Sequence, residues 1–359
     1  MTVPVSSTTP PPSTVEELTA DWLSQALGAS VRGVEATRVG TGQMGTCFRL
    51  ALDAPGSDLP PTVLAKLPAA DPAARALVAG AYRCETRFYT EVAPTLAIRV
   101  PRVHHATDVD DEGRFALLLE DVADARVGDQ LAGCSVPEAV DAAENLAGRH
   151  GPRWCDPRLL EVEGYAVAGP DDAAMLADVL APTVETFLDH ESGIGRLVDP
   201  ADAATLRAAV PLLPDWMVRG PERFAVTHGD YRLDNVLFRD GASSVAVDWQ
   251  TVNLGLPARD LAFFLTTGLT VADRRDGERE VVAAYHRRLT SYGVTLSAEE
   301  CWEDYRYAAL TGLLVEVFGC AFSTRTDRGD RMFATMLART CAAIRDLDTL
   351  SVVRGRLGS

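Results

Sequence analysis

The chain has 359 residues, of which 47% are hydrophobic and 24% are charged, which is enough apolar material for a sizeable core and about two domains. This composition excludes a disordered, fibrous or disulfide-scaffold protein. With 34 basic and 51 acidic side chains the formal net charge is −17, which argues against binding nucleic acid or anionic lipid through a broad basic surface. We therefore expect small-molecule partners, with no nucleic acid and no membrane.

The N-terminal residues and the cysteines predict a reduced, cytoplasmic protein. Residues 1–13 are rich in Ser, Thr and Pro and lack the basic and apolar segments of a secretory signal, so we expect a flexible tail. Seven cysteines are scattered singly without a C-x-x-C pair, which indicates neither a zinc site nor a disulfide framework.

The next region, 14–121, is predicted to combine short strands with two helices. Two overlapping capping boxes at Ser13 and Thr14 begin a helix that stops at Gly28. Three β-prone runs lie within 31–67, a helix is expected within 71–92, and two more strands within 99–105 and 115–119. The expected class is α+β, with a five-stranded N-terminal lobe and one inward-facing helix.

Lys66 is the only lysine among the 34 basic side chains. Where a coding bias favours Arg, a surviving Lys either remains by chance or marks a site whose compact ammonium a planar guanidinium cannot replace. In the helix that follows, Glu85 shares an apolar stripe with Ala81, Phe88 and Val92, and a carboxylate there is costly unless a cation meets it. The alternative is a surface lysine and a solvated acid.

Residues 122–359 are predicted to be mainly helical, with helices at 135–150, 171–190, 200–213, 272–292, 297–322 and 329–347. The apolar run 307–324 contains Glu316 and is only 18 residues long. A buried helix is therefore favoured over a membrane span.

The chemistry concentrates in a predicted hairpin. His228-Gly229-Asp230 precedes one strand, the turn signal Asp240-Gly241 follows it, and Asp248-Trp249-Gln250 ends the next strand. A loop centred on Gly241 and Ala242 would place Asn235 opposite Asp248. An amide oxygen and a carboxylate are ligands that suit Mg²⁺, and Asp230 lies beside them as a candidate base.

The pattern HGDxxxxN followed by DW resembles the aminoglycoside phosphotransferase and choline kinase superfamily of small-molecule kinases, and looks closest to its ecdysteroid-kinase-like branch. The spacing is also similar to the catalytic loop of protein kinases. The resemblance implies a two-lobed protein-kinase-like fold, with a five-stranded antiparallel N-lobe (14–121) and a helical catalytic and substrate-binding C-lobe (122–359).

The resemblance also implies a role for each site residue. Asp230 would take the proton of the substrate hydroxyl, while Asn235 and Asp248 would hold Mg²⁺ on the phosphates of ATP. Lys66 would contact those phosphates and pair with Glu85. The remaining nucleotide contacts would come from a phosphate-covering loop and from the exit of the sheet: Gly40, Gly42, Gly45, Glu120 and Val122.

Several of these residues also have purely structural explanations. The three glycines could serve only the turn, and His228 is expected to brace the catalytic loop rather than react. Asp260 is expected to cap its helix or to hold the loop backbone. The loop departs from many relatives in carrying Arg232-Leu233-Asp234 where they have a His-Pro pair, and Gln250 replaces the Gly of protein kinases.

The function expected from these features is ATP- and Mg²⁺-dependent transfer of a phosphoryl group to a small-molecule hydroxyl. The alternatives are an aminoglycoside kinase and a non-catalytic nucleotide-binding protein, against which the intact Asp230 argues. The acceptor is predicted to be a lipophilic alcohol from the aromatic side chains after the hairpin: Phe263, Phe264, Trp302, Tyr305, Tyr307, Phe318 and Phe322. The nearby acids of the predicted helix are expected to stabilise its N-terminus instead: Glu299, Glu300, Glu303 and Asp304.

Overall fold

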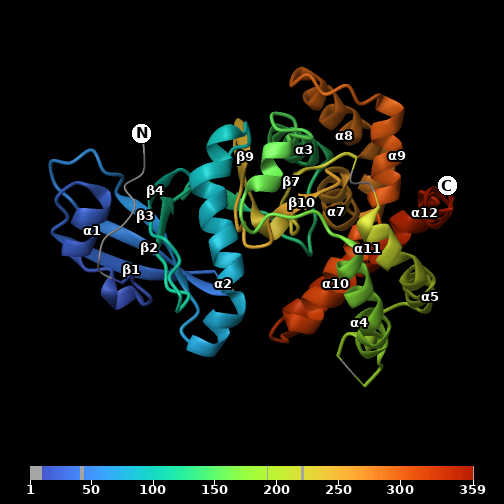
Figure 1. The fold of residues 1–359 in the computed structure, drawn as a ribbon, viewed down its shortest axis with the longest axis horizontal. Coiled ribbons are helices and arrows are strands. Elements are labelled where there is room, and N and C mark those ends of the chain that lie inside the picture. The colour runs from blue at the N-terminus through green and yellow to red at the C-terminus, as the bar shows by residue number, and fades with distance from the viewer. Residues whose placement is uncertain (1–9, 41–43, 192, 220–221, 359) are drawn as a thin grey trace. The chain divides into compact units, whose positions relative to one another are not determined.

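The computed structural model describes residues 10–40, 44–191, 193–219 and 222–358. Within it the chain forms two compact units (Figure 1). Unit 1 comprises residues 1–95, 100–124 and 248–252, and unit 2 comprises residues 96–99, 125–247 and 253–359. The short segment Asp248–Val252 therefore belongs to the N-terminal unit although it follows the second strand of the predicted hairpin.

Unit 1 is built on a five-stranded antiparallel sheet with the order β1-β2-β3-β5-β4. Its strands are β1 (Gly33–Val39), β2 (Gly45–Asp53), β3 (Thr62–Pro68), β4 (Val103–Ala106) and β5 (Leu117–Glu120), and its helices are α1 (Ala20–Leu27) and α2 (Pro72–Arg87). The predicted five-stranded α+β architecture is confirmed.

The core of unit 1 lies between α1 and one face of the sheet. Leu23 of α1 packs with Leu50 of β2 and with Val63, Ala65 and Leu67 of β3. Because side chains alternate between the two faces of a strand, Lys66 points to the opposite face from Ala65 and Leu67.

Helix α2 begins and ends close to its prediction. The Asp71 carboxylate accepts a hydrogen bond from the amide of Ala74 and caps the first turn. After Arg87 the helix widens into a π-helical turn, Phe88–Val92.

One predicted strand starts later than expected. The segment 99–105 was expected to form one strand, but β4 begins only at Val103. The backbone before it is bonded elsewhere, since the Ala97 amide donates to Gly148 and the Arg99 amide donates to the side chain of Asn145.

Unit 2 is mainly helical and carries two small sheets, with the strand orders β6-β8-β9 and β10-β7. The strands are β6 (Arg126–Val127), β7 (Ala225–Thr227), β8 (Val236–Arg239), β9 (Ala242–Ala246) and β10 (Asn253–Gly255). The helices are α3 (Val136–His150), α4 (Pro170–Leu188), α5 (Pro200–Ala209), α6 (Leu213–Val218), α7 (Ala258–Gly268), α8 (Val271–Ser291), α9 (Ala298–Ala308), α10 (Thr311–Phe322), α11 (Asp327–Asp346) and α12 (Thr349–Leu357).

The prediction of a single helix over 297–322 is wrong, because the helix is interrupted between α9 and α10. At the interruption, side chains donate hydrogen bonds to main-chain carbonyl oxygens that would accept from the next helical turn. The Trp216 indole N–H donates to Tyr307 O at 2.9 Å, and the Thr311 hydroxyl donates to Ala308 O at 2.7 Å. In the described part of the chain no helix is both long and apolar enough to cross a membrane.

Candidate active site

A buried ion-pair cluster in unit 1 contains the single lysine. Lys66 Nζ donates to Glu85 Oε1 at 2.7 Å and to Asp248 Oδ1 at 2.8 Å. Lys66 and Glu85 are 7% and 1% exposed, whereas 44% of the Asp248 side chain is accessible. Burial opposes the charge on the lysine, but the two carboxylates outweigh it and raise the pKa of Lys66 above its usual value. The predicted Lys66–Glu85 pair is confirmed.

The segment after Asp248 completes this cluster. The Trp249 amide donates to Glu85 Oε1 at 3.1 Å, and the Trp249 ring stacks on Phe88 with ring centroids 3.7 Å apart. Asp248 itself has a φ of +65°, a left-handed conformation that is uncommon for residues other than glycine. Asp248 is the first residue of the Asp248–Val252 segment of unit 1, and its carboxylate accepts from Lys66 in this conformation.

The predicted phosphate loop is described only in part. Gly40 has a φ of +71° and Gly45 lies so close to β3 that a Cβ atom would approach Leu67 O to 2.8 Å, so both positions require glycine for backbone reasons. Gly42 lies outside the described residues. The hydroxyl of Tyr82 donates to Met44 O and accepts from the Ala69 amide, which ties the end of the loop to α2.

The sheet exit predicted for the adenine contacts follows β5. Glu120 is the last residue of β5, and its amide donates to Arg102 O while its carboxylate accepts from the Arg102 amide at 3.0 Å. Val122 follows two residues later. Nucleotide contacts by these residues stay a prediction.

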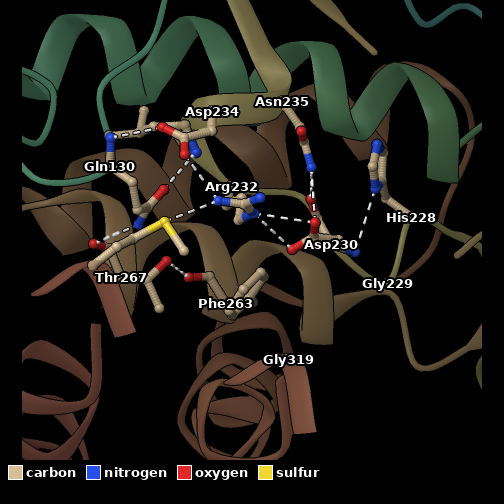
Figure 2. A network of polar contacts seen from close by, with 12 residues as sticks. Gln130, His228, Gly229, Asp230, Arg232, Asp234, Asn235, Phe263, Thr267 and Gly319 are labelled. Carbon is tan, nitrogen blue, oxygen red and sulfur yellow. Dashed lines mark hydrogen bonds and ion pairs between the residues drawn. The ribbon is translucent and has the colours of Figure 1, made fainter. Parts of the chain in front are cut away.

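In unit 2 the candidate base is held from two sides (Figure 2). The Asn235 amide nitrogen donates to the main-chain oxygen and to Oδ2 of Asp230, both at 2.9 Å. Arg232 Nε lies 3.1 Å from both carboxylate oxygens of the same residue. Because the nitrogen of the Asn235 amide must face the carboxylate, its oxygen is turned away and is available to bind a cation.

The predicted pairing of Asn235 with Asp248 is wrong by one residue. Val236 pairs with Ala246, and the Val247 amide donates to Asn235 O at 3.0 Å. The reason is the turn: Arg239 pairs with Ala242 across Asp240-Gly241, and an irregularity between Leu237 and Arg239 shifts the register. Asp248 comes after the end of β9.

His228 and Asp260 brace the start of the loop 228–235, which contains the candidate base. Asp260 Oδ2 accepts from the His228 amide at 2.8 Å, and its Oδ1 accepts from the Gly229 amide at 3.1 Å. The His228 ring is fully buried and its Nε2 lies 3.0 Å from Val247 O. Of the two roles expected for Asp260, the structure shows the second, because it holds the loop backbone.

Buried charge supports this brace. Arg149 donates to the Asp260 carboxylate, and both side chains are almost fully buried. Although burial favours the neutral acid, Arg149 and the neighbouring histidines hold the pKa of Asp260 well below its usual range. Burial lowers the pKa of His150, which contacts Arg149 and the hydroxyl of Tyr285, to about 4. The sequence carries no local signal for this network, because its members come from α3, α7 and α8.

Most of the side chains predicted near the acceptor have structural roles. Five of the seven aromatic residues are buried in the core: Phe263, Phe264, Trp302, Tyr305 and Tyr307. Phe322, by contrast, is 83% exposed and stacks against the partly exposed Phe318. Among the acids of α9, Glu300 caps the N-terminus as expected, since it accepts from the Ser297 amide. The expectation that Asp304 does the same and faces water is wrong, because this residue is buried and pairs with Arg223 and Arg356.

The fold and this loop define a protein of the protein-kinase-like class. A family model described as "Phosphotransferase enzyme family" matches residues 70–305, and the chain belongs to that family. Since its members are phosphotransferases, the protein is an enzyme, a small-molecule kinase. No curated protein sequence matches the chain.

Solved structures share the fold at low sequence identity. Choline kinase from Cryptosporidium parvum Iowa II is 10% identical, with a TM-score of 0.57 over 91% of this chain and 94% of that one. Macrolide 2′-phosphotransferase MphH from Brachybacterium faecium is 18% identical, with a TM-score of 0.50 over 90% and 98%. Aminoglycoside phosphotransferase APH(4)-Ia, solved with ADP and hygromycin B, is 16% identical, with a TM-score of 0.50 over 91% and 97%.

Proposed function

We propose that the protein transfers the γ-phosphoryl group of ATP to the hydroxyl of a small, largely apolar alcohol. The observation that carries the proposal is the Asp230 carboxylate, oriented by Asn235 and Arg232 and still 24% accessible. A carboxylate held in this way can accept a hydrogen bond from an incoming hydroxyl. A protein that only binds nucleotide has no need for it.

The transfer requires few covalent events. The acceptor oxygen forms a bond to the γ-phosphorus while the bond from that phosphorus to the β-phosphate oxygen breaks, and its electron pair leaves with ADP. The acceptor proton passes to a carboxylate oxygen of Asp230. Positioning and charge neutralisation supply most of the rate in such reactions.

The nucleotide side of the reaction is assigned to unit 1. Lys66, held by Glu85, would contact the α- and β-phosphates, and the loop from Gly40 to Gly45 would cover them. ADP in the solved aminoglycoside phosphotransferase supports a nucleotide donor.

The chemistry of two donors, Asn235 in unit 2 and Asp248 in unit 1, suits a magnesium ion that both would hold. The oriented amide oxygen of Asn235 and the accessible carboxylate of Asp248 are hard oxygen ligands of the kind Mg²⁺ prefers. When bound, the ion would neutralise phosphate charge.

The acceptor preference rests on the surroundings of the base. Arg232 Nη1 lies 3.2 Å from Met332 Sδ, and Met332 clusters with Phe263, Met336 and the partly buried Val315. The exposed Phe322, stacked on the partly exposed Phe318, adds apolar surface on α10. Three of the four acids of α9 that would attract an aminoglycoside have partners in the protein: Glu300 accepts from Ser297, Glu303 pairs with Arg306, and Asp304 pairs with Arg223 and Arg356. These features favour a lipophilic or aromatic alcohol.

Two measurements test the proposal. With Mg²⁺ and ATP, we expect kcat/KM for sterol-like or aromatic alcohols to be well above kcat/KM for kanamycin-like substrates. The reverse ranking would reject the apolar acceptor. Asp230→Asn should lower kcat by about 10²–10⁴-fold with nearly unchanged nucleotide affinity. The exposed turn residue Asp240 supplies the control, since Asp240→Asn should leave kcat unchanged. Equal turnover of wild type and Asp230→Asn would reject Asp230 as the base.

A further inference from the structure

Arg232 bridges two carboxylates of the catalytic loop (Figure 2). Its Nε lies 3.1 Å from Asp230 and its Nη1 donates to Asp234 Oδ2 at 3.0 Å. The arginine side chain is 21% exposed, and the two acids are 24% and 19% exposed. At this depth a planar guanidinium with fixed N–H directions holds both partners in one geometry.

Asp234 is anchored on its far side. Its Oδ1 accepts from the Gln130 amide at 3.1 Å, and the exposed Arg328 approaches Oδ2 at 3.5 Å. Asp234 thus contacts Arg232 and the 129–131 segment, whereas the hydrogen bonds described for Asp230 come from Arg232 and Asn235. The geometry makes Asp234 a support for the arginine.

The segment that carries Gln130 is itself rigid. Gln130 is fully buried, its Oε1 accepts from the Leu233 amide at 2.8 Å, and its Nε2 donates to Thr267 O at 2.9 Å. Arg339 of α11 donates to the main-chain oxygens of both Gln130 and Thr267. The Arg232 guanidinium is therefore connected through Asp234 and Gln130 to α7 and α11 by hydrogen bonds. The sulfur of Met332 contacts one of its nitrogens.

We infer that Arg232 is a positioning residue for the phosphoryl transfer, and that Asp234 acts through it. This inference rests on the proposed function of Asp230. Asn235 holds only Oδ2 of the base, so without Arg232 the carboxylate can rotate about its Cβ–Cγ bond. The arginine fixes that rotation and directs the remaining lone pairs toward the acceptor. It also places a positive charge where the acid and the incoming phosphate would otherwise repel each other.

The first test is the kinetics of Arg232→Ala. We expect kcat to fall about 10- to 100-fold, because misplacing a reacting group causes rate losses of this size. KM for ATP and for the acceptor should change little. Guanidinium ion added to this variant should restore part of the lost kcat, while ethylammonium should not. Arg207→Ala is the matched control, because Arg207 makes an exposed two-bond pair with Glu185 and its loss should leave kcat unchanged.

The second test asks whether Asp234 acts through the arginine. Asp234→Asn should lower kcat less than Arg232→Ala does, and the double variant should match Arg232→Ala alone. If instead the fold-decrease in kcat of the double variant equalled the product of the two single decreases, the role of Asp234 would be overturned. Wild-type kcat in Arg232→Ala, or a loss that guanidinium cannot repair, would overturn the role of Arg232.

A structural readout separates this inference from the proposed function. If the wild-type enzyme transferred phosphate to no alcohol, the proposed function would fail, but a crystal structure of Arg232→Ala would still test the inference. We expect the Asp230 carboxylate in that crystal to turn away from the Asn235 amide or to occupy two orientations. A single, unchanged orientation would overturn the inference.

Discussion

Lys66 Nζ lies 2.7 Å from Glu85 Oε1, and the two side chains come from β3 and α2 on the face of the sheet that α1 does not cover. The same ammonium contacts Asp248, so one compact, buried cation serves two acids, of which Glu85 is buried and Asp248 is accessible. A single nitrogen contacts both carboxylates, whereas an arginine head group is wider and planar.

Lys66→Arg is therefore not a conservative change. The planar guanidinium cannot approach both carboxylates within the space of a single nitrogen, so we expect kcat/KM to fall at least about tenfold through lost phosphate positioning. Circular dichroism should show an intact fold. Activity equal to that of the wild type would show that an arginine serves equally well at this position.

Asp248→Ala should abolish Mg²⁺-dependent nucleotide binding, because the proposed metal would lose its charged ligand. Asp240→Ala removes another carboxylate from the same hairpin, at the exposed turn, and should bind Mg·ATP like the wild type. Calorimetric titration of both variants distinguishes a metal ligand from a general effect of charge. Equal Mg·ATP affinity in Asp248→Ala and wild type would rule out the metal role.

Asp260→Asn should affect both stability and turnover. The amide offers one acceptor where the carboxylate serves two loop amides, and it leaves Arg149 without its buried counter-charge. Breaking a buried pair in this way costs about 3–5 kcal/mol, which urea denaturation would measure. We also expect lower kcat at a temperature where the variant is folded, since the backbone before Asp230 is less constrained. Unchanged stability would contradict the buried pair.

Glu316 makes stability depend on pH. Burial raises the pKa of this carboxyl to about 8, although the Thr340 hydroxyl donates to Oε1 at 2.6 Å and favours the ionised form. The folded state thus keeps a proton that the unfolded state releases near its ordinary pKa of 4.5. Stability contributed by the neutral acid is complete below pH 4.5 and is lost progressively as pH rises to 8.

Glu316→Gln removes this titration while keeping the shape of the side chain. The wild type should lose stability between pH 5 and pH 8, whereas the variant should not. The difference in free energy of unfolding, variant minus wild type, should therefore increase by a few kcal/mol over this range, because each unit of pKa shift corresponds to about 1.4 kcal/mol. Denaturant titrations of both proteins at the two pH values measure it. A constant difference between the proteins would contradict the assignment.

Local periodicity explains which parts of the fold and site were predictable. The helical stripe of α2 placed Glu85 on an apolar face that needs a cation, and the resemblance to small-molecule kinases implied that this cation is Lys66. The hairpin register could not be predicted, because the irregularity between Leu237 and Arg239 leaves no mark in an apolar pattern. Such errors move a pairing by one residue.

Other differences arise from contacts distant in sequence. The break between α9 and α10 depends on Trp216, which lies 91 residues before its acceptor Tyr307. A helix at Asp260 was expected, but the bounds of α7 could not be predicted. Nearly all of its residues are buried, so it has no polar face to reveal a period. The contact of Arg232 with Asp230 was not foreseen either, since sequence showed only that a cation had replaced the His-Pro pair.

The return of the chain to unit 1 for Asp248–Val252 limits how this enzyme can be divided. A fragment ending at residue 124 would contain the whole five-stranded sheet but would lose the indole that covers Phe88 and the amide that bonds Glu85. Lys66 would keep one of its two counter-charges. The N-terminal region is thus not an independent folding unit. Its interior is completed by five residues that follow residue 124 by more than 120 positions in the chain.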